Sequence, residues 1–366
     1  MVALALGACG SGAAARPRAT PLVHDAYVWQ RAWTGPVREA VAQPPAAIGG
    51  LIGGLRVLGL ELERDRDRWP AVDAAALAAG GRPVVLVVRV DDARRPDEVP
   101  MVEVGAAVAR WQAAGVDVRG VEIDHDCATA RLPAYAAWLA QARPAAPLAW
   151  SITALPTWAD GAAGRRALRD IAAAVDELVV QVHAVRAPVI FDDAAARADL
   201  RRFARAVPAP KLRVAVPTYD AVVGGALRRT DPLAVAAFVR WLGTTAAPAV
   251  RGVVWFRLPV AGDDRAWSAT TLAAVIGGAP LRAAIAPRLA RAADGGYDVV
   301  IDNLGNLPGP WPDVALDGDG VRAELIGGYR ASPDGRHFTA PARDVAPGAT
   351  TVVGWATGRA LLIHAP

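Results

Sequence analysis

Val118–Cys127 reads V-R-G-V-E-I-D-H-D-C, and this stretch decides the fold assignment. Apolar and acidic side chains alternate within it: Val121, Glu122, Ile123, Asp124 and Asp126. Alternate residues of a β-strand share a face, so the pattern predicts three carboxylates on one side and aliphatic side chains on the other. Three like charges on one face repel one another, and a buried carboxylate resists ionisation. The alternative is a strand at a solvent-facing sheet edge with ordinary surface acids.

Similar strand-like stretches recur along the chain. Each is rich in Val, Ile, Leu or aromatic residues and is bounded by Gly, Pro or charge. In order they are Val23–Gln30, Leu55–Glu63, Pro83–Val90, Arg119–Asp126, Leu148–Leu155, Glu177–His183, Leu212–Thr218 and Gly252–Leu258. Helical patterns lie between or after them, at Val99–Ala114, Leu132–Ala142, Ala167–Val175, Ala194–Val207, Pro232–Leu242 and Ser268–Ile276.

Eight strands that alternate with helices over residues 21–280 predict a (β/α)8 barrel, an α/β fold of about 250 residues. An open doubly wound sheet is the alternative. It is less consistent with the sequence, because no Gly-rich phosphate loop follows the first strand.

Residues 281–366 change character and predict a small β-rich domain. Short strands are expected at Tyr297–Ile301, Val314–Leu316, Arg322–Ile326, Thr350–Trp355 and Ala360–His364. Turns are expected between them at Asp317–Gly320 and Ser332–Gly335, where Asp, Pro and Gly cluster. No chemically convergent set of residues stands out here, so a structural appendage is the expected role.

The composition excludes several classes of protein. The net charge of +4 comes almost entirely from arginine, because Lys211 is the only lysine, and no basic block interleaves with aromatic residues. We therefore expect no nucleic-acid partner. No apolar run reaches the length of a membrane-spanning helix. The two cysteines, Cys9 and Cys127, are too few for a disulfide scaffold or a cysteine-rich zinc site, and we expect no metal and no cofactor.

The N-terminus resembles a targeting segment. Residues 1–8 are short and apolar, and Leu6-Gly7-Ala8-Cys9 resembles a bacterial lipobox, although no basic segment precedes it. This resemblance implies a signal peptide, lipidation of Cys9 and a flexible linker up to Thr20. The protein would then be a lipid-anchored, periplasm-facing envelope protein, at the outer membrane in preference to the inner. Cys127 would be left as a buried free thiol.

Candidate functional residues gather at the C-terminal ends of the predicted barrel strands, where such barrels carry their chemistry. They are mainly acids, amides, hydroxyls and tryptophans, a set that suits a sugar: Trp29, Glu61, Glu63, Arg89, Asp91, Glu122, Asp124, Asp126, Thr153, Trp158, Gln181, His183, Thr218, Tyr219, Asp220, Trp255 and Arg257. Carboxylates can do acid–base work, and flat indole rings can stack on pyranose rings. Trp29, Trp158 and Trp255 are the candidates for stacking, with burial in the core as the alternative for each.

Arg119–Asp126 resembles the fourth-strand motif D-G-x-D-x-D-x-E of family 18 (chitinase-like) glycoside hydrolases. Gly120 and Asp124 match, Glu122 takes the first interior Asp position, and Asp126 replaces the terminal Glu. Lys211–Tyr219 is similar to the seventh strand of that family, Gly252–Trp255 to the eighth, and Ser151–Ala154 to the fifth. The whole chain, with V-E-I-D-H-D and the lipobox, resembles a bacterial lipoprotein family described as domain of unknown function 3142.

The resemblance implies roles for the acidic strand. Asp126 would be the general acid, and Asp124 would orient an N-acetyl group of the substrate that itself attacks the anomeric carbon. Glu122 would lie deeper and raise the pKa of its neighbours. This chain departs from the family pattern at two positions. Asp126 is one methylene shorter than the Glu of the family, and His183 stands near the position of a tyrosine that binds the N-acetyl carbonyl.

Three hypotheses follow. The first is a retaining glycosidase that acts on an envelope or extracellular polysaccharide. The second is a non-catalytic glycan-binding or scaffold lipoprotein on a degenerate hydrolase barrel. The third is a metal-dependent hydrolase that uses His125 and His183, but His125 should point away from the carboxylate face.

Overall fold

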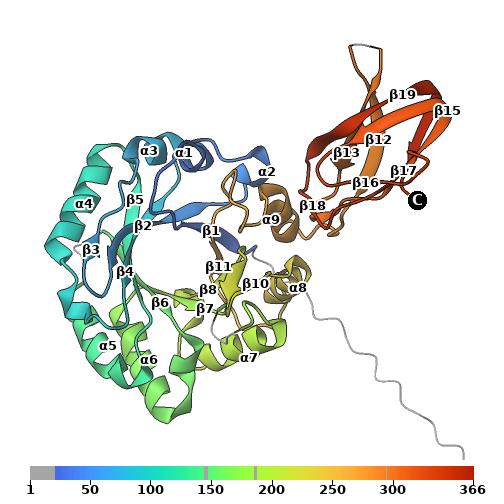
Figure 1. The fold of residues 1–366 in the computed structure, drawn as a ribbon. Helices are drawn as coiled ribbons and strands as arrows, with labels where there is room; N and C mark the ends of the chain where they lie inside the picture. The colour runs from blue at the N-terminus through green and yellow to red at the C-terminus, as the bar shows by residue number, and fades with distance from the viewer. Residues whose placement is uncertain (1–20, 144–146, 185–187, 294) are drawn as a thin grey trace, which may run out of the picture.

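The computed structural model describes residues 21–143, 147–184, 188–293 and 295–366. Eight parallel strands close into a barrel, because β1 pairs with both β11 and β2 and the other strands follow in the spatial order β8, β7, β6, β5 and β4. Helices surround the ring of strands (Figure 1). The predicted (β/α)8 barrel is confirmed.

All eight predicted barrel strands are present, with ends that differ from the predictions by at most two residues. They are β1 (Val23–Val28), β2 (Gly54–Leu62), β4 (Val84–Val90), β5 (Val118–His125), β6 (Ala149–Ala154), β7 (Glu177–Gln181), β8 (Leu212–Pro217) and β11 (Gly252–Phe256). A short strand, β3 (Asp67–Arg68), pairs antiparallel with the end of β2.

Helices connect the strands on the outside of the barrel: α1 (Gly35–Ala42), α2 (Ala46–Gly49), α3 (Ala74–Gly80), α4 (Met101–Ala113), α5 (Leu132–Gln141), α6 (Gly161–Ala174), α7 (Asp193–Phe203), α8 (Pro232–Leu242) and α9 (Ala269–Ile276). Four 3₁₀ turns lie in the connections, at Pro96–Glu98, Thr129–Arg131, Pro156–Ala159 and Ala209–Lys211. The sequence patterns missed α1, α2 and α3, which are short, and an antiparallel hairpin of β9 (Ala221–Val223) and β10 (Ala226–Arg228) after β8. At α8 the Asp231 side chain accepts a hydrogen bond from the Leu233 amide and Pro232 opens the helix, as predicted.

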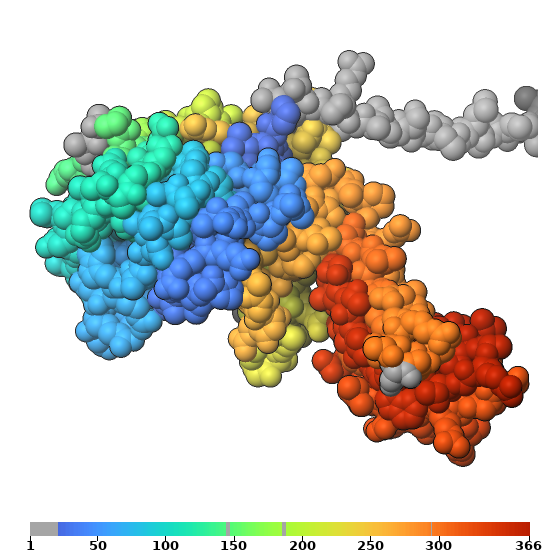
Figure 2. All heavy atoms as spheres, turned by 90° about the horizontal axis from the view of Figure 1, so that it is seen from above, coloured from blue at the N-terminus to red at the C-terminus, as the bar shows by residue number. Residues whose placement is uncertain are grey.

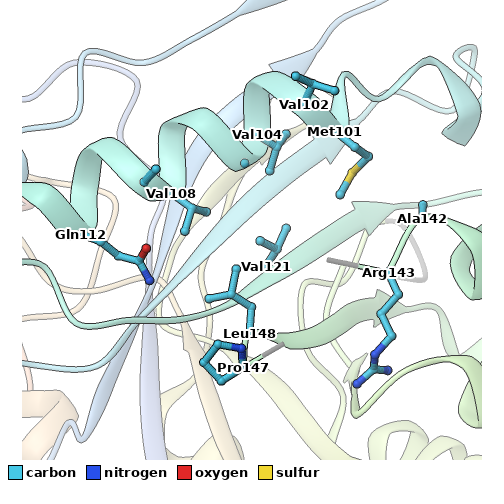
Figure 3. A pocket seen from close by; sticks show the side chains of 12 residues that line it. Met101, Val102, Val104, Val108, Gln112, Val121, Ala142, Arg143, Pro147 and Leu148 are labelled. Atoms are coloured by element: carbon cyan, nitrogen blue, oxygen red, sulfur yellow. The ribbon is translucent and has the colours of Figure 1, made fainter. Parts of the chain in front are cut away.

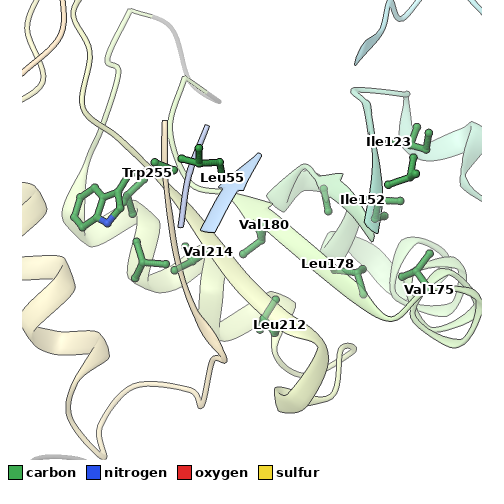
Figure 4. Close-up of a cluster of buried hydrophobic side chains, with 14 of the residues drawn as sticks. Leu55, Ile123, Ile152, Val175, Leu178, Val180, Leu212, Val214 and Trp255 are labelled. Atoms are coloured by element: carbon green, nitrogen blue, oxygen red, sulfur yellow. The ribbon is translucent and has the colours of Figure 1, made fainter. Parts of the chain in front are cut away.

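Alternation along the strands separates two environments. Outward side chains such as Ile123, Ile152 and Val214 pack with the helices in one large hydrophobic core (Figure 4). A smaller apolar group, which includes Val87 and Val254, fills part of the barrel interior. On β5 the aliphatic residues face the helices and the carboxylates face the interior, which confirms the predicted two-sided strand.

The C-terminal region forms a second β structure with its own core. Six strands pair in the order β12 (Ile285–Arg291), β13 (Tyr297–Asn303), β19 (Thr350–His364), β15 (Val314–Leu325), β17 (His337–Thr339) and β16 (Arg330–Ala331), beside the two-stranded pair β14 (Gly309–Pro310) and β18 (Asp344–Val345). Its core contains Val299, Ile301 and Val353. In the space-filling view this region forms a lobe of its own (Figure 2). The domain boundary after residue 280 stays a prediction.

Two details of the C-terminal prediction were wrong. The Asp317–Gly320 segment is not a turn between strands, since it lies within β15 and pairs with β19 through register shifts. Likewise, the two strands predicted within 350–364 are one long strand. The β-bulges keep the strand pairing continuous through the glycines, whereas clustered Asp and Gly residues in a sequence usually predict a turn that ends a strand. Ser332–Gly335 does form the predicted turn between β16 and β17.

Candidate functional site: the mouth of the barrel

Buried charges fill the floor of the barrel. Arg56 on β2 is paired with Glu122 on β5 and Glu177 on β7, and all three are buried. Arg213 on β8 completes the network: its Nε donates to Glu177 Oε2 at 2.7 Å, and its Nη1 lies 2.9 Å from Asp25 Oδ2. Three carboxylates thus meet two guanidinium groups in the interior. Buried charges of this kind are tolerated because each has an opposite charge in contact.

Glu122 belongs to this floor. Its side chain is fully buried, Tyr27 Oη donates to Oε1 at 2.7 Å, and Ser151 Oγ lies 3.3 Å from Oε2. Burial raises the pKa of Glu122, and the positive charge of Arg56 opposes that rise. Both carboxylate oxygens are occupied and have no access to solvent. The structure therefore places Glu122 beneath the candidate site, where it cannot touch a substrate, and corrects its expected place among the catalytic groups.

Above the floor, one arginine holds the other two acids of β5. Arg89 on β4 lies beside Asp124 in the strand register. Its Nη1 donates to Asp124 Oδ2 at 3.1 Å and to Asp126 Oδ2 at 3.0 Å. The second oxygen of Asp124 accepts a hydrogen bond from Thr153 Oγ1 at 2.5 Å. Asp124 is therefore held at both of its carboxylate oxygens.

Asp126 differs from its two neighbours because it follows the last residue of β5 and its side chain is 31% exposed. Burial and then the negative charge of Asp124 raise the pKa of Asp126, and Arg89 opposes them. Oδ1 of Asp126 has no hydrogen-bond partner among the described residues. Of the three predicted acids, Asp126 alone combines a partly exposed side chain with an open oxygen, and its raised pKa favours the protonated form.

Aromatic rings line the opposite side of the interior, since β11 lies four strands from β5 around the barrel. Phe256 of β11 is at their centre, with ring centroids 5.2 Å from Trp29, 5.4 Å from His183 and 5.4 Å from Tyr219. Trp29, Phe256 and Tyr219 are all partly exposed. The mouth thus combines acids on one side with apolar rings on the other.

His183 lies behind these rings rather than in the open mouth. It is 3% exposed, and burial lowers its pKa to about 3, so the imidazole is neutral at ordinary pH. Tyr219 Oη lies 3.5 Å from His183 Nδ1, at the long limit of a hydrogen bond. Gln181 donates from Nε2 to the His183 carbonyl at 3.0 Å. Tyr219 and Gln181, both partly exposed, are better placed than His183 to meet a ligand.

The remaining polar candidates already have partners. Arg31 donates two hydrogen bonds to Glu61, from Nε to Oε2 at 2.7 Å and from Nη2 to Oε1 at 2.5 Å. Asp91 accepts from the Ala93 amide within its own loop at 2.9 Å, and this hydrogen bond lowers its pKa. Arg257 donates from Nη2 to Asp263 at 2.6 Å. The sequence patterns missed Arg31, although it lies two residues beyond Trp29.

Two predicted stacking residues are not in the mouth. Trp255 is fully buried on the helix side of β11, where its Nε1 donates to His24 Nδ1 at 3.1 Å (Figure 4). Trp158 is also fully buried, and its Nε1 donates to the Cys127 carbonyl at 3.0 Å. The assignment of Trp255 was wrong because alternation along β11 turns Val254 and Phe256 inward and Trp255 outward. The same alternation could have identified Phe256.

A cavity of about 480 Å³ lies outside the barrel wall, between α4 and the starts of β5 and β6 (Figure 3). Its lining is mainly apolar, with Met101, Val108, Val121 and Leu148, and the polar side chains come from Gln112 and Arg143. None of the residues at the barrel mouth lines it. This cavity is therefore separate from the acids of β5.

Other predicted features can be placed in part. Cys127 is a buried free thiol whose pKa burial raises to about 12, as expected from sequence. His125 packs against Tyr135 on the helix side, also as expected. Cys9 lies outside the described residues. Across residues 21–366, apart from the undescribed gaps, no three His, Cys, Asp or Glu side chains converge as metal ligands. The helices of that same part are all too short or too polar to cross a membrane.

The solved structures similar to this chain include a spore cortex-lytic enzyme and chitinases. The spore cortex-lytic enzyme SleL of Bacillus cereus aligns over 73% of this chain and 76% of its own, with 11% identity and a TM-score of 0.49. A chitinase from Chromobacterium violaceum aligns over 71% and 99%, with 13% identity and a TM-score of 0.47. A class V chitinase from Pseudomonas fluorescens aligns over 65% and 95%, with 14% identity and a TM-score of 0.47.

No curated protein matches the sequence. Residues 80–261, which run from the end of α3 past β11 and include Asp124, Asp126 and Arg89, match the model of one protein family. That family is described as domain of unknown function (DUF3142), and these residues of the chain are similar to it.

Proposed function

We propose that this protein is a carbohydrate-active barrel that hydrolyses a glycosidic bond, with Asp126 as the general acid. One observation carries the proposal: Asp126 is a partly exposed carboxyl with a raised pKa and an open Oδ1, held beside a fixed Asp124. A general acid works best when its pKa lies near the working pH. The negative charge of the neighbouring Asp124 contributes to the raised pKa of Asp126, as expected for a general acid beside a second carboxylate.

In the proposed reaction, the proton on Asp126 Oδ1 moves to the glycosidic oxygen as the bond from that oxygen to the anomeric carbon breaks. Arg89 keeps Asp126 in place through Oδ2, and Asp124 supplies negative charge next to the cationic sugar that develops. Thr153 and Arg89 hold both oxygens of Asp124, and Arg31 holds Glu61. The attacking group is therefore the substrate's own N-acyl oxygen or a water molecule, rather than the carboxylate of Asp124 or Glu61. Water, whether it attacks directly or hydrolyses the N-acyl intermediate, gives one proton to the Asp126 carboxylate, which restores the acid.

The other side of the mouth would position the sugar. Trp29 and Phe256 offer partly exposed ring faces for the C–H side of a pyranose. The Tyr219 hydroxyl and the Gln181 amide lie near Phe256 and His183 and would bind sugar hydroxyls or an amide group. This division of labour, with acids on β5 and rings on β1 and β11, supports an oligosaccharide lying across the barrel mouth.

Reducing-end release from a panel of polysaccharides tests the proposal. The panel should include N-acetylated and non-acetylated β-linked glycans. Wild type should release reducing ends from at least one of them, and Asp126→Asn and Asp124→Asn should each lower the rate by at least about 10²-fold. Asp91→Asn is the matched control, because Asp91 also follows a barrel strand but is engaged in its own loop. Equal release by wild type and Asp126→Asn would refute the assignment.

One observation favours a second candidate, a non-catalytic glycan-binding protein on the same barrel. Arg89 contacts both Asp124 and Asp126, and its positive charge opposes the rise in the pKa of Asp126. An acid kept ionised cannot donate a proton. Glycan binding that survives both carboxamide substitutions, without turnover by wild type, would establish this candidate in place of the first.

The cellular setting is a further part of the proposal: an envelope lipoprotein anchored at Cys9. It is supported by Leu6-Gly7-Ala8-Cys9 and the apolar residues before it. In cells given a labelled fatty acid, the full chain should take up label and sediment with membranes, and Cys9→Ala should do neither. Labelling that is unchanged in Cys9→Ala would exclude this anchor.

A further inference from the structure

The C-terminal sheet carries an aromatic ring on its outer face. Trp355 lies on β19, a central strand, and is 45% exposed. The inner face of the same sheet packs Val299, Ile301 and Val353 into the core of this region, and Trp355 takes no part in that core. A large aromatic side chain in mid-sheet would bury most area by facing inward, so its outward position needs a cause.

A β-bulge supplies that cause. In the register between β13 and β19, Val299 pairs with Gly354 and Val300 pairs with Val352, which leaves Val353 as an extra residue. The extra residue reverses the alternation, so Val353 faces the core while Val352 and Trp355 face outward. At position 354 a Cβ atom would lie 2.1 Å from the Glu324 carbonyl oxygen, so only glycine fits. The backbone is therefore built to present Trp355 to solvent.

Carboxylates flank the ring on both sides. Asp298 on β13 and Glu324 on β15 are the direct cross-strand partners of Trp355. Side chains in such positions lie about 5 Å apart at their Cβ atoms. Neither carboxylate has a hydrogen bond or an ion pair within the part of the chain that the structure describes. The ring thus lies between two unpartnered acceptor groups.

Donor groups lie next to this arrangement. Arg322 shares the face of Glu324, two residues away, and pairs in register with Thr357. Both of these residues are exposed. The surface therefore offers an apolar ring face, acceptors at the two edges of the ring, and an adjacent cation and hydroxyl.

This chemistry matches a neutral pyranose. The C–H bonds on one face of the sugar carry partial positive charge and can stack on the negative face of the indole. The hydroxyls at the rim of the sugar can donate to Asp298 and Glu324. An anionic polymer would be repelled by the two carboxylates. A second copy of the chain stacked face to face about a two-fold axis would bring the like charges of both sheets together.

We propose that Trp355, Asp298 and Glu324, together the Trp355 platform, form a binding site for a neutral polysaccharide on the C-terminal sheet, separate from the barrel mouth. The site goes beyond the proposed hydrolysis, since it would hold a polymer whether or not the barrel cleaves it.

Retention of the full chain on insoluble neutral polysaccharides, cellulose and chitin, tests the platform. Wild type should be retained on at least one of them. Trp355→Ala should weaken retention at least tenfold, Trp355→Tyr should retain part of the affinity, and Asp298→Asn with Glu324→Gln should weaken it severalfold. Trp69→Ala, which removes an exposed tryptophan of the barrel region that is 39% exposed, is the matched control and should bind as wild type does.

Each contrary result is specific. Undiminished retention of Trp355→Ala, retention of wild type on neither polymer, or retention on an anionic polymer alone would overturn the platform. So would a dimer in solution that Trp355→Ala dissociates, since it would assign this face to a second copy of the chain. The same variants separate the platform from the proposed hydrolysis in the barrel. Trp355→Ala should cleave short soluble oligosaccharides as wild type does. Asp126→Asn should still be retained on the polymer.

Discussion

Arg89 Nη1 lies 3.0 Å from Asp126 Oδ2 and holds the proposed acid against the barrel wall. The same nitrogen reaches Asp124 at 3.1 Å, so one cation joins the two carboxylates that the sequence pattern selected. Burial and Asp124 push the pKa of Asp126 up, while Arg89 pulls it down. The balance between these opposing effects decides whether Asp126 holds a proton at a useful pH.

Arg89→Gln should shift this balance toward the protonated acid. Without the guanidinium, the negative charge of Asp124 is less compensated, and the pKa of Asp126 rises further. The basic limb of the pH profile of kcat/KM reports loss of the proton from the acid, and it should move to higher pH by about one unit or more. Arg94→Gln, which removes an arginine paired with Glu98, should leave the limb in place. A limb that moves to lower pH would contradict the role given to Arg89.

Arg56→Met should destabilise the fold strongly. The substitution leaves Glu122 and Glu177 buried without their shared cation, and breaking a buried ion pair on one side costs about 3–5 kcal/mol. Arg119→Met is the control, because Arg119 is exposed on β5 and its pair with Asp117 contributes about 0–1 kcal/mol. Denaturant unfolding measures both. A cost for Arg56→Met similar to that of Arg119→Met would mean that the floor network is dispensable.

The stability of the protein should fall in acid through the buried His183 and the partly buried His24. Burial lowers the pKa of His24 to about 4 and of His183 to about 3, while both titrate near 6.5 when unfolded. Below about pH 6.5 the unfolded chain therefore binds protons that the folded chain does not, until the pH falls to about 3–4. Each histidine contributes a slope of up to about 1.4 kcal/mol per pH unit over that range, with stability lost as pH falls.

The measurement is the free energy of unfolding at pH 7, 5.5 and 4.5. His183→Gln should reduce the pH slope relative to wild type, and comparing the slopes removes the shared contribution of the carboxyl groups. His337→Gln is the control, because it removes an exposed imidazole in the C-terminal sheet, and it should leave the pH slope close to that of wild type. A slope unchanged by His183→Gln would show that His183 takes up protons in the folded protein as it does in the unfolded chain, and would contradict the lowered pKa.

The two tryptophans that the sequence treated alike should behave differently. Trp255→Ala removes a fully buried ring and should cost about 3–5 kcal/mol of stability. Trp29→Ala removes a partly exposed ring at the mouth, so it should cost less stability but weaken oligosaccharide binding by about tenfold. Unfolding and calorimetric binding of the same two variants separate these effects. A binding loss confined to Trp255→Ala would reverse the assignment.

The barrel could be predicted because each strand carries its own signal. Apolar stretches bounded by Gly, Pro or charge located all eight strands, and alternation on Val118–Cys127 gave the correct sides of Ile123 and Asp124. Helices α1 and α3 were missed because they are short, and α3 consists mostly of alanine, which makes its apolar stripe hard to distinguish.

The site was harder to predict because pairing between distant residues decides it. Nothing local in the sequence shows that Arg56 neutralises Glu122, 66 residues away, or that Arg89 bridges Asp124 and Asp126. These contacts follow from strand order and register. By contrast, the inward position of Phe256 could have been derived from alternation on its strand, and it was overlooked because Trp255 is the more familiar sugar-stacking residue.

Reducing-end release by wild type and Asp126→Asn, measured side by side on the same N-acetylated and non-acetylated β-glycans, tests the central claim most directly. Circular dichroism should first show that the variant is folded. Release by wild type that falls at least about 10²-fold in Asp126→Asn is the predicted result. Equal release by the two proteins, or binding of a glycan by both without any release, would contradict the assignment of Asp126 as the general acid of a glycosidase.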